Sequence, residues 1–496
     1  MGGVVAFSVP AGRMMVRGAL TMVLLILSTY TLCVHQDECP VFLPTISHTW
    51  EHPPGSYISR WTVGVVTDLM AVMMFVVYWA DAAAKRAPTK WDGLADTALL
   101  ATSVAAIFCL SWVGAICDSD DPDCRGNNTI HTIFATTFFL LFDLFMVSLH
   151  FHPRGAPTAM AARRPRAHVL ELALAALSCA LTVVQVRFDL GDTLLACVEW
   201  TNVGVIVAWL VSNSTRLGTF AVGLVRTDTA DGAWTVRSAL SSRDLLRSTI
   251  GLSVGTLASS LVAAVVFGNL PSDKTIPYIS DLWVYPPGNW LSRWGVVHGA
   301  HCLALLHVML ASARVGVSAR LPAALALVLP LVAALGLSVV GCVNEDENLS
   351  IHLTAAGVWF GLYDVYMVLV VLGSSDGYAR RAAPSALAAI ACQVARFALP
   401  HAAAALVGAA ANVKDLEALL EWTNFGLMLT FLSTLVRSAL DAPDSALEKL
   451  HFAVLEAKSR ASTGEGPACL LEAPLLAQPV GTSVLLAEVR PQRTHV

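Results

Sequence analysis

The chain has 496 residues, of which 56% are hydrophobic and 14% are charged, and its mean hydropathy is +0.64. A soluble domain needs a polar surface that this composition does not provide, so the sequence predicts an integral membrane protein. The formal net charge of −5 is spread over loops and tail, and no run of basic residues indicates nucleic-acid binding.

Apolar runs of about 18 to 24 residues recur along the chain, each long enough to cross roughly 30 Å of hydrocarbon as an α-helix. The first run ends without a small-residue cleavage site, so we interpret it as a retained span rather than a signal peptide. The predicted fold class is all-α, a polytopic membrane protein with about twelve transmembrane helices. In chain order the predicted spans cover residues 17–35, 61–80, 95–116, 132–151, 168–186, 196–213, 248–268, 294–313, 321–341, 352–373, 386–409 and 419–438.

Lysine and arginine indicate the orientation of these helices, because they accumulate in loops on the cytosolic side. Most of them fall on one side of the predicted spans, for example Lys85, Arg164, Arg243 and Arg380. Both termini are therefore expected in the cytosol. The cysteines expected on the opposite side lie where disulfides can form, but the sequence does not assign their pairing: Cys33, Cys39, Cys117, Cys124 and Cys342.

The chain contains an internal duplication. Three segments recur in the same order and with similar spacing: PTISHTWEHPPGSYISRW at 44–61 and PYISDLWVYPPGNWLSRW at 277–294; IHTIFATTFFLLFDLFMV at 130–147 and IHLTAAGVWFGLYDVYMV at 351–368; VEWTNVG at 198–204 and LEWTNFG at 420–426. Such self-similarity indicates two copies of one structural unit.

Each copy has an even number of predicted spans, so the two copies have parallel topology and can be related by an axis along the membrane normal. The expected organisation is a first six-helix unit at 1–215, a polar cytosolic linker at 216–247, a second six-helix unit at 248–440 and a mostly disordered cytosolic tail at 441–496.

The sequons at Asn127 and Asn348 occupy the same loop of each copy, and both are candidate glycosylation sites. Glycosylation requires a lumenal or extracellular loop. The positions of the sequons therefore agree with the orientation that the basic residues predict.

The recurring motifs resemble the FRAG/DRAM/SFK family, and the resemblance covers both copies. The family comprises six-span proteins, among them the damage-regulated autophagy modulators, the post-GPI-attachment factor and the N-terminal region of the cell-wall-biogenesis protein CWH. Its PYISD motif falls on residues 277–281, which include Ser280 and Asp281, and its histidine falls on His352. Its Glu-Trp pair falls on Glu421 and Trp422.

The first copy keeps Ser47, His131, Glu199 and Trp200 but has His48 where the motif has aspartate. If only one copy retains a family-like site, we expect it to be the second.

Ionisable residues inside the predicted spans are costly unless paired, and so they are candidate functional groups. Asp143 and Asp364 lie at matching positions, and Arg396 is expected to pair with Asp364. Asp68 of the first copy aligns with His301 of the second. The candidate polar site comprises Ser280, Asp281, His301, His352, Asp364, Glu421 and Trp422 with Ser47, Asp68, His131, Asp143, Glu199 and Trp200.

Two catalytic arrangements are conceivable. His298 and His301 share a helical face and, with His352 and Asp364, offer metal-ligating groups, but no spacing is diagnostic and we predict neither a metal nor a cofactor. A pair of Ser280 and His352 could transfer an acyl group if the two side chains approach to about 3 Å.

The favoured function is a non-catalytic membrane protein of endomembranes that acts in membrane lipid organisation, trafficking or autophagy through its lumenal loops and an intramembrane polar cavity. The alternative that the resemblance implies is GPI-anchor lipid remodelling in the Golgi or endoplasmic reticulum, and a transporter is a third class. The expected partners are membrane lipids, including GPI lipids or phosphoinositides, and other membrane proteins. The expected location is the Golgi, lysosomal or plasma membrane.

Overall fold

The computed structural model describes residues 4–84, 90–119, 125–151, 165–188, 190–226, 234–272, 274–318, 321–373, 377–406 and 410–457. Cys124 and the tail beyond residue 457, where disorder is expected, lie outside the described residues.

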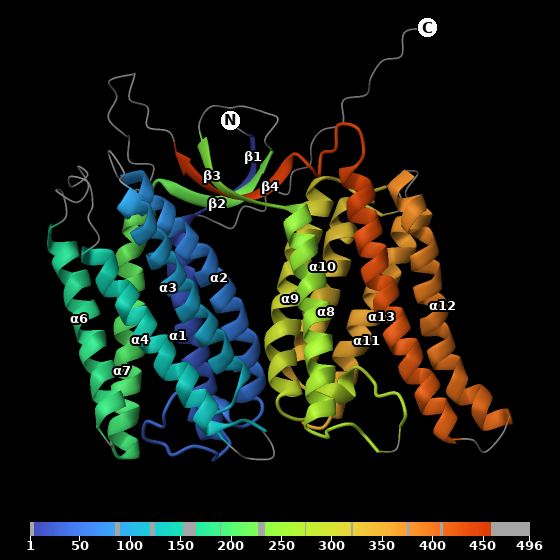
Figure 1. The fold of residues 1–496 in the computed structure, drawn as a ribbon, viewed down its shortest axis with the longest axis horizontal. Coiled ribbons are helices and arrows are strands. Elements are labelled where there is room, and N and C mark those ends of the chain that lie inside the picture. Colours follow the sequence, from blue (N-terminus) through green and yellow to red (C-terminus); the bar gives the residue numbers. More distant parts are fainter. Residues whose placement is uncertain are drawn as a thin grey trace, which may run out of the picture. The chain divides into compact units, whose positions relative to one another are not determined.

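Within the described residues, 12 helices are long and apolar enough to cross a membrane, which confirms the predicted fold class (Figure 1). The helices of the first unit are α1 (Ala11–His35), α2 (Gly55–Ala84), α3 (Lys90–Ala115), α4 (Asn128–Phe151), α6 (Pro165–Arg187) and α7 (Asp192–Ser214). Those of the second unit are α8 (Ser242–Val266), α9 (Gly288–Ser312), α10 (Ala323–Cys342), α11 (Leu349–Gly373), α12 (Gly377–Leu406) and α13 (Ala410–Leu440). Several helices begin before the predicted spans, because the helical backbone also includes polar residues that precede the apolar run.

The loops that carry the repeated motif lie on one side of the helices, which we call the lid side. Residues 36–54 and 267–287 form these two lid loops, and each contains a short 3-10 helix, His48–Trp50 and Ser280–Trp283. A cis peptide bond occurs at matching positions, between Pro53 and Pro54 and between Pro286 and Pro287.

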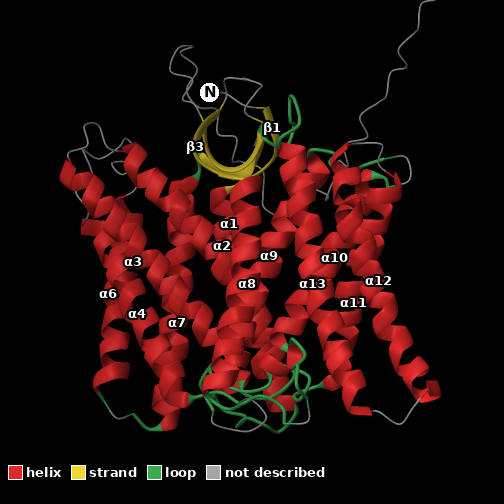
Figure 2. Cartoon of the chain, turned by 45° about the vertical axis from the view of Figure 1, so that its right-hand side comes forward, coloured by secondary structure: helices red, strands yellow, loops and turns green. Residues whose placement is uncertain are grey.

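A four-stranded antiparallel sheet covers the opposite side of the helices, which we call the sheet side (Figure 2). Its strand order is β1-β2-β4-β3. The strands are β1 (Val4–Pro10), β2 (Phe220–Arg226), β3 (Trp234–Ser241) and β4 (Leu450–Ala457). The N-terminus, the linker and the tail each contribute to it, and sequence analysis assigned no strand to any of these segments.

Each unit has its own hydrophobic core, and the sheet contacts both. Val222 of β2 and Val454 of β4 belong to the core of the first unit. Leu224 of β2 and Leu450 of β4 belong to the core of the second unit. Because neighbouring strands carry residues of both cores, the sheet links the two units on their sheet side.

Helices α2 and α9 meet where the two units touch. Gly64 of α2 faces Val297 of α9, which is its equivalent in the duplication (297 − 64 = 233). A Cβ atom at Gly64 would lie 2.7 Å from Cγ1 of Val297, so the crossing requires glycine there. Small residues allow membrane helices to approach this closely.

Candidate functional site

In the first unit, the family residues converge beneath the lid loop. Oγ of Ser47 lies 3.0 Å from Nε2 of His131, and the backbone N–H of Ile46 donates to Oε2 of Glu199 at 3.0 Å. The Ser47 hydroxyl also lies 3.5 Å from Oε1 of Glu199. Nδ1 of His131 lies 2.6 Å from the carbonyl oxygen of Ile116 and must donate to it, which leaves Nε2 of a neutral ring to accept from Ser47.

In the second unit, the histidine keeps the equivalent partner and the serine does not. Nδ1 of His352 bonds the carbonyl oxygen of Val343 at 2.7 Å, and Val343 follows α10 as Ile116 follows α3. Ser280 donates instead to Oε2 of Glu345 at 3.1 Å, and Asp281 accepts from the Lys274 ammonium at 2.9 Å. The serine–histidine approach considered for Ser280 and His352 is therefore found between their equivalents in the first unit.

Glu345 lies in the loop after α10, and burial raises the pKa of its carboxyl, as does the neighbouring carboxylate of Asp281.

The tryptophans of the Glu-Trp motif tie the last helix of each unit to its lid loop. Nε1 of Trp200 donates to the carbonyl oxygen of Pro44 at 2.8 Å, and Nε1 of Trp422 donates to that of Pro277 at 2.9 Å. Since the same bond recurs in both units, these residues position the lid loop.

The ionisable residues within the helices do not gather in one polar cavity. Oδ1 of Asp143 lies 2.5 Å from Oγ of Ser178 inside the first unit. Asp364 lies in α11, apart from Arg396, which pairs instead with Glu421 at 2.9 Å. The expected Arg396–Asp364 pair is wrong because of depth: Arg396 and Glu421 each lie roughly 15 Å from the lid-side ends of their helices, and Asp364 roughly 22 Å.

Among the described residues, His301 pairs with Asp68 of the first unit and not with His352 or Asp364. Nδ1 of His301 is 2.6 Å from Oδ2 of Asp68, and Nδ1 of His298 is 3.0 Å from Oδ1. The residues that align in the duplication thus meet at the boundary between the two units.

A long apolar cavity lies inside the first unit. About 940 Å³ within it is not filled by protein atoms, including the part open to the surroundings. Helices α1, α2, α3, α4 and α7 line it with methionine, leucine, valine and phenylalanine side chains. At its lid end, Ser47 supplies a hydroxyl and Glu199 a carboxylate. Along α7 the cavity extends from Glu199 to Leu210, about 16 Å.

The second unit has a much smaller space of about 300 Å³. Phe425 stands there where the first unit has Val203 (425 − 203 = 222), and Trp359 stands where it has Phe138 (359 − 138 = 221). The bulkier side chains fill the equivalent volume. Space for a large apolar group is therefore present in the first unit.

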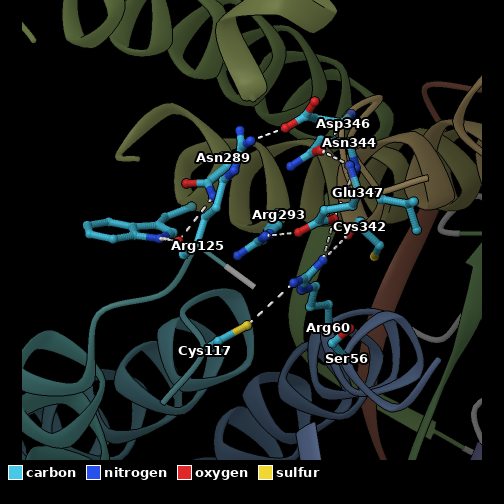
Figure 3. Close-up of polar contacts among 12 residues, drawn as sticks. Ser56, Arg60, Cys117, Arg125, Asn289, Arg293, Cys342, Asn344, Asp346 and Glu347 are labelled. Atoms are coloured by element: carbon cyan, nitrogen blue, oxygen red, sulfur yellow. Dashed lines mark hydrogen bonds and ion pairs between the residues drawn. The ribbon is translucent and has the colours of Figure 1, made fainter. Parts of the chain in front are cut away.

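A buried ion cluster on the lid side joins the two units, and sequence analysis did not anticipate it (Figure 3). Arg60 of α2 and Arg293 of α9 are equivalent residues (293 − 60 = 233), and both bond the carboxylate of Glu347. Nη1 of Arg60 lies 2.8 Å from Oε2 of Glu347. Their side chains are at most 2% exposed. The signal in the sequence was the arginine repeated at the same position of each copy.

Burial alone would raise the pKa of the Glu347 carboxyl, but the charges of Arg60 and Arg293 outweigh it and hold the pKa below its ordinary value. Beside this cluster, Arg125 forms an ion pair with Asp346, its equivalent in the second copy (346 − 125 = 221). Each unit thus offers one member of a complementary pair.

The lid side also holds disulfide bonds among the cysteines that the sequence places there. Cys33 in the last turn of α1 bonds Cys39 of the first lid loop, and Cys117 is likewise disulfide-bonded. Cys342 is a free thiol.

The fold defines a class of protein, a polytopic membrane protein built from two six-helix units of one ancestry. The model of the family described as Frag1/DRAM/Sfk1/Cwh43P N-terminal domain matches residues 14–215 and again residues 243–437. The chain belongs to this family and carries its domain twice in tandem. No curated protein and no solved structure matches the chain.

Proposed function

We propose that the protein organises membrane lipids by holding a lipid in its first six-helix unit. The apolar cavity beneath the first lid loop is the observation that carries this proposal. Its walls suit an acyl or other hydrocarbon chain, and the polar groups at its lid end, Ser47 and Glu199, suit the ester or hydroxyl region of the same lipid.

The length of the cavity suits the hydrocarbon chain of a lipid. It extends about 16 Å along α7, close to half of the roughly 30 Å hydrocarbon thickness. Leu210, at its far end, lies four residues from the end of α7, so a chain that enters at the lid end passes the middle of the helix bundle. The lid loop, tied down by Trp200 and by the Ile46–Glu199 bond, would then cover the headgroup region.

A filling mutation tests the lipid site. Gly18 lines the cavity, and a Cβ atom there would meet no atom within 4 Å, so Gly18→Leu fills space without a clash. Gly251 is its equivalent in the second unit (251 − 18 = 233), and a Cβ atom there would likewise meet no atom within 4 Å, but Gly251 is exposed and lies outside the cavity, so Gly251→Leu is the control.

Full-length protein is purified in nanodiscs with a photoactivatable acyl-chain lipid, and crosslinked peptides are mapped. We expect crosslinks on α1, α2 and α7 in wild type and in Gly251→Leu, and at least a tenfold loss in Gly18→Leu. Equal crosslinking in Gly18→Leu and wild type would refute the cavity as a lipid site.

Lipid remodelling remains a second candidate because of one observation, the 3.0 Å approach of Ser47 to His131 at the lid end of the cavity. In that function the Ser47 hydroxyl would attack an ester carbonyl of a GPI-type lipid while His131 takes the hydroxyl proton. The bond between the acyl carbon and the lipid's alcohol oxygen would break, and His131 would return the proton to that oxygen, so that the serine carries the acyl group and the lipid leaves as its lyso form. Ser47→Ala distinguishes lipid holding from lipid remodelling. Both functions predict that the variant still crosslinks to lipid. Acyl-chain exchange on GPI-anchored proteins in cells that express the variant stops only if Ser47 is a nucleophile.

We also propose that the lid side faces the lumen or the cell exterior of an endomembrane or the plasma membrane, with both termini in the cytosol and a role in trafficking or autophagy. Oδ1 of Asn127 accepts from the backbone of Ile130, and Oδ1 of Asn348 accepts from that of Ile351, so each amide oxygen caps a helix while its nitrogen carries the glycan. Deglycosylation should shift the electrophoretic mobility of wild type and leave an Asn127→Gln/Asn348→Gln variant unchanged. An identical pattern for both proteins would count against this orientation.

A further inference from the structure

Three side chains with metal-ligating atoms meet where the two units touch. Asp68 of α2 belongs to the first unit, and His298 and His301 of α9 belong to the second. Each offers one ligand atom, and these atoms all lie within 4.8 Å of one another. The two histidines are three residues apart, so they lie on one face of α9 and point to the same carboxylate.

The cluster lies inside the membrane-spanning part of both helices. Asp68 is thirteen residues from the first residue of α2 (68 − 55), about 20 Å from its lid-side end. A carboxylate at that depth costs several kcal/mol unless a cation or hydrogen bonds compensate it. Two imidazole rings are neutral in their unprotonated form, so they solvate the carboxylate but do not cancel its charge.

The donor set matches that of a bound transition metal. Two imidazole nitrogens and one carboxylate oxygen form the ligand group of several catalytic zinc and iron sites. Ligand atoms about 2.0–2.2 Å from a tetrahedral ion are about 3.3–3.6 Å apart. The observed separations, 3.0 Å from Nδ1 of His298 to Oδ1 of Asp68 and 2.6 Å from Nδ1 of His301 to Oδ2, are shorter than this spacing, so the rings must move outward to admit an ion.

Accessibility and orientation agree with a site that an ion can enter. The Asp68 side chain is 43% exposed, whereas those of His298 and His301 are 12% and 23% exposed. Among the described residues, Nε2 of His301 is buried and has no hydrogen-bond partner. The ring is therefore fixed by the contact of its Nδ1 with Asp68.

We propose that Asp68, His298 and His301 bind one divalent transition-metal ion of the Zn²⁺ type at the boundary between the two units. The ion neutralises the intramembrane carboxylate and leaves a coordination position open. Because one ligand comes from the first unit and two from the second, the ion ties α2 to α9. This inference is independent of the lipid cavity, which lies within the first unit.

Cobalt tests the site, since Co²⁺ occupies zinc sites and absorbs visible light there. Full-length protein in detergent is stripped with a chelator and titrated with Co²⁺, and Zn²⁺ is then added to displace it. We expect wild type to show a visible band that saturates at one equivalent, and Asp68→Asn and His301→Gln to lose it. Zn²⁺ should raise the Tm of wild type and not that of Asp68→Asn.

Asp364→Asn is the matched control, because it removes another intramembrane carboxylate that has no histidine beside it, and it should keep the band. Cobalt could also bind at two other groups, His48/Glu51/His52 and His150/His168/Glu171. Binding at Asp68 is therefore measured as the difference between the absorption spectra of wild type and Asp68→Asn. A wild-type protein without a zinc-displaceable band, or an unchanged band in Asp68→Asn, overturns the proposal. If Asp68→Asn fails to fold, the wild-type titration and His298→Gln decide it.

Discussion

Glu347 compensates two buried arginines at once, and this makes it the residue on which the boundary between the units most depends. Arg60 and Arg293 would repel each other without it, since both are buried and lie on facing helices. Further bonds to the carbonyl oxygens of Cys342 and Ala115 complete the cluster. Removing one member of a buried ion pair leaves an uncompensated charge, which costs far more than the intact pair contributes.

Glu347→Gln should therefore lower the free energy of unfolding by about 3–5 kcal/mol. The neighbouring Asp346→Asn is the control, because Asp346 is 52% exposed and its pair with Arg125 should contribute about 1 kcal/mol or less. Thermal unfolding in detergent measures both. Similar Tm losses for the two variants would show that the Glu347 cluster is not specially important.

The same residue predicts a pH dependence with a definite sign. The pKa of Glu347 is held below its ordinary value of 4.5, so its contribution to stability is complete above that value and is lost as the pH falls through the folded-state pKa. The Tm difference between wild type and Glu347→Gln should stay constant from about pH 7 to pH 5 and shrink below about pH 4.5. A difference that grows on acidification contradicts the assignment.

Among the elements, β4 holds the sheet together because it lies between β2 and β3. A chain truncated after Asp441 loses β4, leaving β2 with β1 alone and β3 without a neighbour. We expect that truncation to increase amide hydrogen exchange in β2 by at least tenfold and to lower the yield of monodisperse protein. Truncation after Ala457 keeps every strand and should behave as wild type; comparable exchange in both truncations would mean that β4 does not stabilise the sheet.

The helices were predictable because the length and hydropathy of each run indicate a membrane span without reference to any other part of the chain. The strands were not, because each has only seven or eight residues and pairs with a strand more than two hundred residues away. The segment 447–458 even has an amphipathic pattern, and pairing with β2 and β3 makes Leu450–Ala457 within it a strand.

The candidate site was predictable in its residues but not in its contacts. The repeated motif identified Ser47, His131 and Glu199, which do converge. It did not reveal that the equivalent Ser280 would bond Glu345, since that depends on how the loop after α10 folds over the lid. The apolar cavity depends on the size of Val203 and its neighbours, which a motif does not encode.

For the whole molecule, the contacts between units predict that two separately expressed halves will reassemble. Cutting within residues 227–233 separates β2 from β3 and leaves each unit with its six helices. The α2–α9 crossing, the Glu347 cluster and the β2–β4 pairing should hold the halves together. An affinity tag on the N-terminal half should recover the C-terminal half in equal amount, and Glu347→Gln should reduce the recovery severalfold; separate elution of two folded halves would disprove this.

The pairing of equivalent positions has a consequence for how the protein can evolve. Arg125 faces Asp346, Gly64 faces Val297 and Asp68 faces His301, and in each case a residue meets its own counterpart. In a homodimer every substitution appears on both sides, so arginine would face arginine and valine would face valine. Joining the copies in one chain removed that restriction and let each side change alone, so neither half should now bind a second copy of itself as well as it binds the other.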